Sequence, residues 1–260
     1  MVLALVPLGN VAAAEPQPAA NSGFDSYINS LESRLARQHQ SYSSFLAGLD
    51  ASENSRNRLR SGELIVEKLT PASGPDLPGA MLHHWRATAF VPGARAADFE
   101  RMTKDFNSYP QHFAPQVAQA HLLSERDDHG IDLVVASMRV RQKHIITVVM
   151  DMAYDVAFGR LDPLHGYSLS RSMRIAEIES PGTSRERALS ASEEHGFLWR
   201  LNTYWSWEER DGGLYMQIET VSQTRSIPAG LGWAVRPFVE SVPRESLEFT
   251  LRSACNVLRR

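Results

Sequence analysis

The 260-residue sequence predicts an α+β fold in which a long antiparallel sheet is closed by a C-terminal helix. The first observation behind this prediction is a succession of strand-like runs between residues 63 and 228. The second is a tight-turn sequence, Arg-Asp-Gly-Gly, flanked by two alternating runs. The third is an apolar stripe with helical spacing near the C-terminus, at Val242, Leu247, Leu251, Ala254 and Leu258.

Residues 1–14 begin with an apolar run and end in Ala12-Ala13-Ala14, a small-residue pattern typical of signal-peptide cleavage. We therefore predict a truncated signal peptide and an exported protein, periplasmic or extracellular. The basic residues that usually open such a signal are missing, and without a signal the protein would be cytoplasmic. We expect no integral membrane segment, because this run is too short to cross a bilayer and charges interrupt every later apolar run.

Residues 15–60 are predicted to form a linker and an N-terminal amphipathic helix. The stretch 15–23 (EPQPAANSG) has the composition of a linker. Apolar residues then recur every three, four or seven positions, which places them on one face of a helix that packs on the outside of the main domain. The series consists of Phe24, Ile28, Leu31, Leu35, Tyr42, Phe45 and Leu49.

The remainder, residues 61–260, is predicted to be one domain. A helix follows the second strand and ends before Pro110, residues 124–130 (SERDDHG) form a hairpin turn, and Pro237 and Pro243 divide the C-terminal helix into a short and a longer part. The apolar run 131–161 is too long for a single strand and is assigned two. The other expected strands cover residues 63–69, 80–92, 117–123, 166–179 and the two arms of the hairpin within 198–228.

This hairpin has the clearest local pattern. A turn at Asp211-Gly212 sets the register, and the alternation of side chains separates an apolar face from a polar face expected to be in water. The apolar face either fills a core or lines a ligand pocket. The predicted pairs are Trp207 with Met216, Trp205 with Ile218 and Thr203 with Thr220. The polar face carries Arg200, Asn202, Tyr204, Glu208, Tyr215, Gln217 and Glu219.

Residues 63–260 resemble the SRPBCC superfamily, also called START-like or Bet v 1-like. The resemblance rests on Trp205, Trp207, Gly213, Tyr215 and the Ser226-Ile227-Pro228 ending, and on the stretch FERMTKDFNSYPQHF, which is similar to polyketide cyclase and Coq10-type members. It implies a helix-grip fold, a curved antiparallel sheet wrapped around a C-terminal helix, with a cavity between them. Members bind lipids, sterols, polyketides or other apolar ligands, and a minority are enzymes. The proline-containing terminal helix and the extra N-terminal helix depart from the pattern.

The resemblance and the apolar hairpin face together predict binding of an apolar or amphipathic small molecule, of lipid, polyketide or aromatic acid type. Arg171 lies on an apolar strand face, where it either pairs with Asp151 or Asp155 or meets the carboxylate of a ligand. The candidate pocket residues are Trp85, Arg171, Leu201, Trp205, Trp207, Met216, Ile218, Trp233, Leu247 and Leu251.

Two other functions stay open. A cyclase- or dehydratase-type enzyme on the same fold would use Arg171, a histidine and buried tyrosines, and a structural or interaction domain would have a filled core. The adjacent histidines His83-His84 point to opposite faces of a strand and so do not share a metal ion. No nucleotide, metal or serine-hydrolase motif occurs, and no basic stripe suggests nucleic acid. We therefore expect a ligand-binding protein without a cofactor rather than an enzyme.

Overall fold

The computed structural model describes residues 15–49, 52–71, 77–143, 147–227 and 232–260, with only the backbone described in 232–240. A single antiparallel sheet runs through the molecule in the order β1-β2-β9-β8-β6-β5-β4-β3, with the short β7 paired to β6. The strands are β1 (Ile65–Lys68), β2 (Ala80–Pro92), β3 (Val117–Asp128), β4 (Ile131–Lys143), β5 (Thr147–Asp162), β6 (His165–Glu179), β7 (Arg187–Ala188), β8 (Arg200–Arg210) and β9 (Gly213–Arg225).

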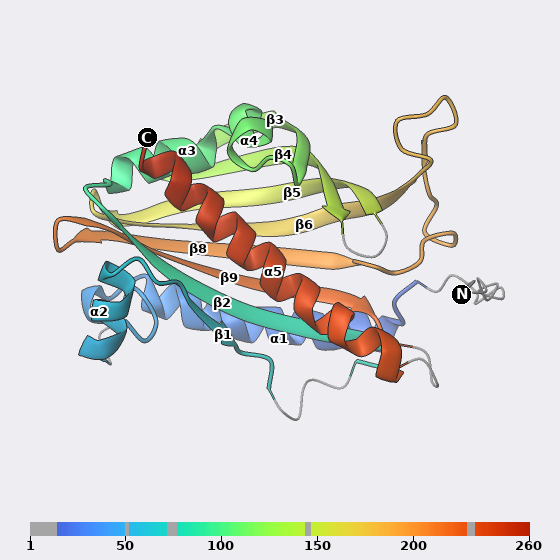
Figure 1. The fold of residues 1–260 in the computed structure, drawn as a ribbon, viewed down its shortest axis with the longest axis horizontal. Helices are drawn as coiled ribbons and strands as arrows, with labels where there is room; N and C mark the ends of the chain where they lie inside the picture. Colours follow the sequence, from blue (N-terminus) through green and yellow to red (C-terminus); the bar gives the residue numbers. More distant parts are fainter. Residues whose placement is uncertain (1–14, 50–51, 72–76, 144–146, 228–231) are drawn as a thin grey trace, which may run out of the picture.

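Helices lie on both faces of this sheet (Figure 1). The C-terminal helix α5 crosses one face diagonally, and the N-terminal helix α1 runs along the opposite face. The predicted α+β class, a helix-grip arrangement with an extra N-terminal helix, is therefore confirmed. The helices are α1 (Pro18–Gln38), α2 (Glu53–Arg60), α3 (Ala96–Lys104), α4 (Tyr109–His112) and α5 (Gly232–Leu258), with short 3-10 turns at Tyr42–Ser44 and Phe106–Ser108.

The β8–β9 hairpin has the register that its turn sequence predicts. Its two-residue turn, Asp211-Gly212, has φ angles of 58° and 73°, as the tight turns favoured in hairpins require. The sequence supplies the residues that tolerate positive φ. The pairs Trp207 with Met216, Trp205 with Ile218 and Thr203 with Thr220 all form.

Four boundary predictions are wrong. Helix α1 begins at Pro18, inside the stretch expected to be a linker, and it ends at Gln38, so Tyr42, Phe45 and Leu49 lie beyond it. The predicted turn at 124–130 is too early, because β3 continues to Asp128 and the turn is His129-Gly130, with φ angles of 55° and 84°. The charged residues before this turn lie in an edge strand, where their side chains reach water. The C-terminal helix is also not divided, since α5 is continuous through Pro237 and Pro243. Each proline removes one backbone hydrogen bond, and packing of the helix on the sheet outweighs that loss.

The face of the sheet beneath α5, which we call the concave face, carries the main apolar core. This core joins strands far apart in the sequence to α3 and α5, and Phe99, Leu214, Met216, Leu247 and Leu251 are almost completely buried in it. Burial of such side chains supplies the main driving force for folding, about 1.5–3 kcal/mol for each large apolar residue.

The opposite face, which we call the outer face, is covered by the N-terminal segment rather than by water. Phe24, Ile28, Leu31 and Leu35 of α1 pack on it as the predicted stripe requires, whereas Tyr42 is exposed. The segment after α1 continues the cover with Phe45, Leu46 and Leu49, which pack with Leu59, Phe90 and Tyr215.

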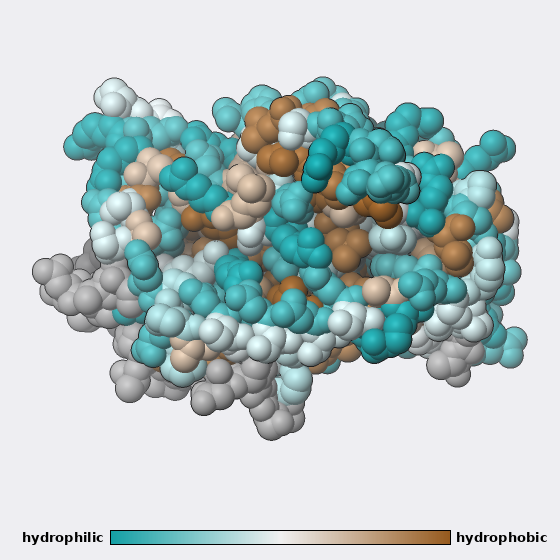
Figure 2. Space-filling model, turned by 180° about the vertical axis from the view of Figure 1, so that it is seen from behind, coloured by the Kyte–Doolittle hydropathy of each residue, from teal (hydrophilic) through white to brown (hydrophobic). Residues whose placement is uncertain are grey.

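The expectation that the polar hairpin face lies in water is therefore wrong. The amphipathic helix needs an apolar partner, and the concave face is already occupied by α5. Figure 2 views the molecule from the outer-face side and shows apolar side chains gathered beyond the helix. Leu133 and Val135 of β4 line a cavity of about 150 Å³ together with residues of β3 and Asp155 of β5. No helix in the described part of the chain is both long and apolar enough to cross a membrane.

Candidate functional site

The concave face beneath α5 is the candidate site, and its two ends differ. At the end near the hairpin turn, the Phe99 ring meets Trp205 and Trp207 edge-on, with centroids 5.1 and 5.2 Å apart. Trp207 also lies against Gly166, where any Cβ would overlap the indole. Close packing of this kind leaves no room for a ligand among these side chains.

The other end of the concave face is only partly covered by the described residues. Apolar side chains from several strands are half-buried there and pack against the edge of the core. Leu201 and Thr203 of β8 are half-buried beside them. The half-buried apolar side chains, which we call the open floor, are Trp85, Met138, Val140, Val148, Ile175, Leu198 and Leu201.

Few polar groups accompany the open floor. The indole Nε1 of Trp85 is buried and has no hydrogen-bond partner among the described residues. An indole N–H is a donor only, and leaving such a donor buried and unpaired costs about 1–3 kcal/mol. Thr220 lies directly across from Trp85 in the β2–β9 ladder but does not accept this bond. A ligand with an acceptor atom would satisfy it.

Burial keeps two tyrosines and the cysteine on this side of the sheet uncharged near neutral pH. The Tyr109 hydroxyl donates to the carbonyl of Thr103 at 2.6 Å, and burial raises the pKa of Tyr109 well above its usual range. Burial does the same to the pKa of Tyr154, and it raises the pKa of the Cys255 thiol to about 11. These groups contribute apolar surface and neutral hydrogen bonds rather than charge near neutral pH.

The structure separates the candidate pocket residues into four groups. Trp85 and Leu201 belong to the open floor. The side chain of Trp233 lies outside the described residues. Arg171 lies on the outer face, against α1. The remaining six, Trp205, Trp207, Met216, Ile218, Leu247 and Leu251, are buried in the packed core.

Arg171 forms no hydrogen bond with Asp151 or Asp155, although Asp155 lies directly across from it in the β5–β6 ladder and its charge contributes to the raised pKa of Arg171. Its guanidinium donates two hydrogen bonds of 2.7 Å to Glu32 of α1, while Asp151 receives two from Arg139. A bulge in the pairing of β6 with β5 separates Arg171 from Ile175, so the two residues are on opposite faces. Arg171 therefore helps to attach α1, and sequence reasoning missed Glu32 because the pairing crosses 139 positions of chain.

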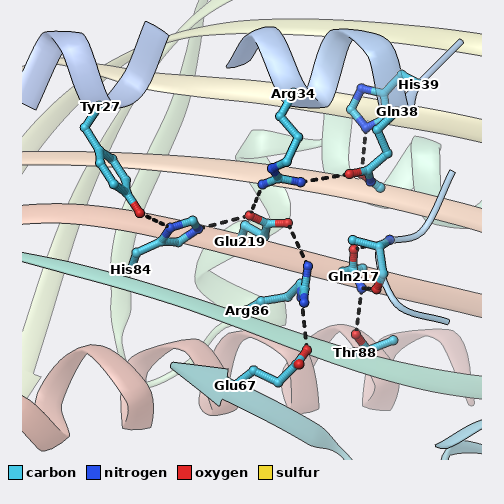
Figure 3. Close-up of polar contacts among 12 residues, drawn as sticks. Tyr27, Arg34, Gln38, His39, Glu67, His84, Arg86, Thr88, Gln217 and Glu219 are labelled. Carbon is cyan, nitrogen blue, oxygen red and sulfur yellow. Dashed lines mark hydrogen bonds and ion pairs between the residues drawn. The ribbon is translucent and has the colours of Figure 1, made fainter. Parts of the chain in front are cut away.

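Beneath α1, the outer face holds a buried polar cluster that sequence reasoning did not find (Figure 3). The Tyr27 hydroxyl lies 2.7 Å from His84 Nδ1, and His84 Nε2 lies 3.0 Å from Glu219 Oε2. Arg34 reaches the same carboxylate oxygen at 2.5 Å, and Arg86 lies 3.6 Å from the other oxygen. We call Tyr27, Arg34, His84, Arg86 and Glu219 the outer polar cluster.

Opposing effects set the charge of Glu219. Burial by itself would raise the pKa of this carboxyl, but the hydrogen bond from His84 and the positive charges of Arg34 and Arg86 lower it overall. Burial and the charge of Glu219 raise the pKa of Tyr27, so the phenol keeps its proton, and its hydroxyl shares a hydrogen bond with His84 Nδ1. The outer polar cluster thus places an ionised carboxylate under α1, with one partner from α1 and two from β2.

Next to this cluster, polar side chains of the outer face form hydrogen bonds with the end of α1 and the segment that follows it. Gln217 donates to the carbonyl of Ala47 and accepts from its amide, both at 2.9 Å. His39 Nε2 shares a 2.8 Å hydrogen bond with the Ser206 hydroxyl, and the imidazole stacks on Tyr167. Burial, with a further contribution from Arg34, lowers the pKa of His39 to about 4. The arrangement attaches α1 to the sheet and offers no opening to a substrate among the described residues.

No protein-family model and no curated protein matches the chain. Similar solved structures include a START superfamily protein from Mycobacterium smegmatis, with 13% identity, a TM-score of 0.43, and coverage of 68% of this chain and 97% of that one. The Zhui aromatase/cyclase from Streptomyces sp. R1128 has 15% identity, a TM-score of 0.45, and coverage of 69% and 95%.

A STAR-related lipid transfer protein from Xanthomonas axonopodis has 16% identity, a TM-score of 0.44, and coverage of 75% of this chain and 99% of that one. Two of these three solved structures are of START-type proteins, and one is of an aromatase/cyclase.

Proposed function

We propose that the chain binds an apolar or amphipathic small molecule, of lipid, polyketide or aromatic acid type, on the open floor beneath α5. The observation that carries this proposal is the row of half-buried apolar side chains that includes Trp85, with its indole N–H unpartnered among the described residues. Binding sites for small molecules are largely apolar, with a few polar groups that fix orientation.

The division of the concave face supports the same function. A close-packed core at the turn end holds the strands in place, so a ligand that binds on the open floor should require little rearrangement of the sheet. Tyr109 and Tyr154, whose pKa values burial raises, stay neutral beside this surface. The expected ligand therefore has a mainly apolar body and one acceptor oxygen for Trp85.

Tryptophan emission of the purified protein tests this proposal, with oleate and 2-naphthoate as separate probes. We expect either probe to shift or quench emission, and Trp85→Phe to reduce both the signal and the affinity. Trp207→Phe is the matched control, because Trp207 lies in the packed core and its loss should leave binding intact. The absence of any emission change, together with no co-purifying molecule in native mass spectrometry, would rule the proposal out.

The packed end of the core favours a second candidate, a structural or interaction domain without a ligand. Trp207, Leu247 and Leu251 fill the space in front of the hairpin. If this filling continues beneath the whole helix, neither probe will bind, and Ile175→Ser will lower stability without affecting any ligand. The same titrations therefore distinguish the two functions.

We also propose that the protein is exported. The support is the small-residue pattern Ala12-Ala13-Ala14, and residues 1–14 lie outside the described part of the structure. N-terminal sequencing of the protein purified from its native host should find Glu15 as the first residue. Recovery of the chain with Met1 in place would contradict export by cleavage of this leader.

A further inference from the structure

A cavity of about 270 Å³ lies between α5 and the edge of the sheet at β1. This edge is on the other side of α5 from β4, β5 and β6, which carry part of the open floor (Figure 1). The volume corresponds to about nine water molecules. Its lining, which defines the arginine cavity, consists of Arg58, Glu63, Leu64, Val66, Arg244, Glu248 and Arg252.

The charges in the arginine cavity come from α2, from α5 and from Glu63 in the connection between α2 and β1. Arg58 belongs to α2, while Arg244 and Arg252 lie two helical turns apart on α5. Three arginines against two glutamates leave a net positive charge, and the half-buried apolar side chains of Leu64 and Val66 complete the lining. An anion that binds there meets more positive than negative charge.

Two of the arginines are oriented by their glutamate neighbours. Glu63 receives two hydrogen bonds from Arg58, at 2.8 and 2.5 Å, and Glu248 receives one from Arg244 Nε at 2.8 Å. A guanidinium has five N–H donors, so both arginines keep donors for a further acceptor. Arg252 makes no ion pair or side-chain hydrogen bond with any described residue. Three guanidinium groups with donors to spare therefore line one cavity.

We propose that the arginine cavity binds a phosphate group, which is carried either by a soluble molecule or by a lipid. Planar guanidinium groups bind phosphate oxygens with paired hydrogen bonds, and a tetrahedral anion can accept from all three arginines at once. The cavity has room for a small substituent on the phosphate as well. This site is separate from the open floor, and it stands whether or not an apolar ligand binds there.

Isothermal titration of the full chain with inorganic phosphate at low ionic strength tests the proposal. We expect saturable binding that weakens as salt is added, because exposed charges are screened. Arg252→Gln should weaken phosphate binding about tenfold, as expected for the loss of charged hydrogen bonds. Arg37→Gln is the matched control, since Arg37 is an exposed arginine on α1, and it should bind like the unaltered protein.

A second variant should change the phosphate affinity in the opposite direction. Glu248→Gln removes a negative charge from the cavity and releases Arg244, so it should tighten phosphate binding severalfold. General damage to the fold would not produce this gain. Equal phosphate affinity in Arg252→Gln and Arg37→Gln, or no binding to the unaltered protein, would overturn the proposal.

Vesicles distinguish the two sources of phosphate. Co-sedimentation with phosphatidylcholine vesicles that contain phosphatidate, lost in Arg252→Gln and absent with phosphatidylcholine alone, would identify a lipid phosphate. Binding of inorganic phosphate without co-sedimentation would identify a soluble phosphorylated molecule. The proposed apolar site is monitored independently by tryptophan emission, so failure at one site does not imply failure at the other.

Discussion

The two faces of the sheet bury the same strands in different ways. On the concave face, Trp205 and Trp207, which are two residues apart on β8, both pack into an apolar core under α5. On the outer face, Tyr204 and Ser206 of β8 contact the N-terminal segment through Glu32 and His39, and Glu219 of β9 is 2% exposed. The concave face excludes water mainly by apolar packing, and the outer face combines apolar packing with a network of hydrogen bonds and ion pairs.

This difference shows that alternation of apolar and polar residues along a strand does not by itself identify the face that is exposed to water. An apolar core loses stability in proportion to the volume removed, whereas a buried polar network depends on each member because every remaining group is left without a partner. The two faces should therefore respond differently to substitution, to pH and to charge.

We expect the largest loss of stability from a substitution on the concave face. Trp207→Ala should lower the free energy of unfolding by about 4 kcal/mol, because it leaves a large cavity beside Phe99. Urea unfolding followed by circular dichroism measures this change. Trp199→Ala, at a half-buried position near the start of the hairpin, should cost clearly less. Equal losses would show that Trp207 is not part of a close-packed core.

We expect the next largest loss of stability from a substitution on the outer face. Glu219→Ala should cost about 3 kcal/mol, because Arg34 and His84 lose the carboxylate that compensates their burial. Glu219→Gln keeps the shape and should cost less. Hydrogen exchange of the α1 amides should increase more than that of the α5 amides. Uniform acceleration across both helices would contradict a local role for the outer polar cluster.

Acid should weaken the outer face selectively. His39 has a pKa of about 4 in the folded protein and about 6.5 when unfolded, so the unfolded state binds more protons between these values. Stability is then retained above pH 6.5 and falls as pH decreases, by about 2 kcal/mol between pH 7 and pH 5. His39→Gln should flatten this part of the curve of unfolding free energy against pH. An unchanged slope in the variant would show that His39 does not cause it.

The smallest effect is expected at the rim of the outer face. Arg171→Ala breaks the pair with Glu32, but the Arg171 side chain is 45% exposed, and water screens the interaction. The loss should stay below about 1 kcal/mol. A double-mutant cycle with Glu32→Gln measures the coupling free energy directly. A coupling as large as the effect of Glu219→Ala would place this pair in the same class as the buried cluster.

Much of the fold could be predicted because its signals are local. The positive φ angles at Asp211 and Gly212 are available to the residues present there, and they determine the register of Trp205 and Trp207. The apolar stripe of α1 likewise predicted an amphipathic helix that packs outside the domain. The candidate site could be predicted only in part, since alternation identifies a common face but not how much of that face another element covers.

The sequence by itself determined the order of the elements, the pairing of the hairpin and the residues that share each face, because these depend on neighbours a few positions apart. Only the tertiary structure decided that Glu219 is buried under α1, that Arg171 pairs with Glu32, and that Trp207 is packed while Trp85 lies on the open floor. These outcomes depend on contacts between segments separated by more than a hundred residues. Such contacts are set by how two complete faces fit together, and a linear pattern does not contain that information.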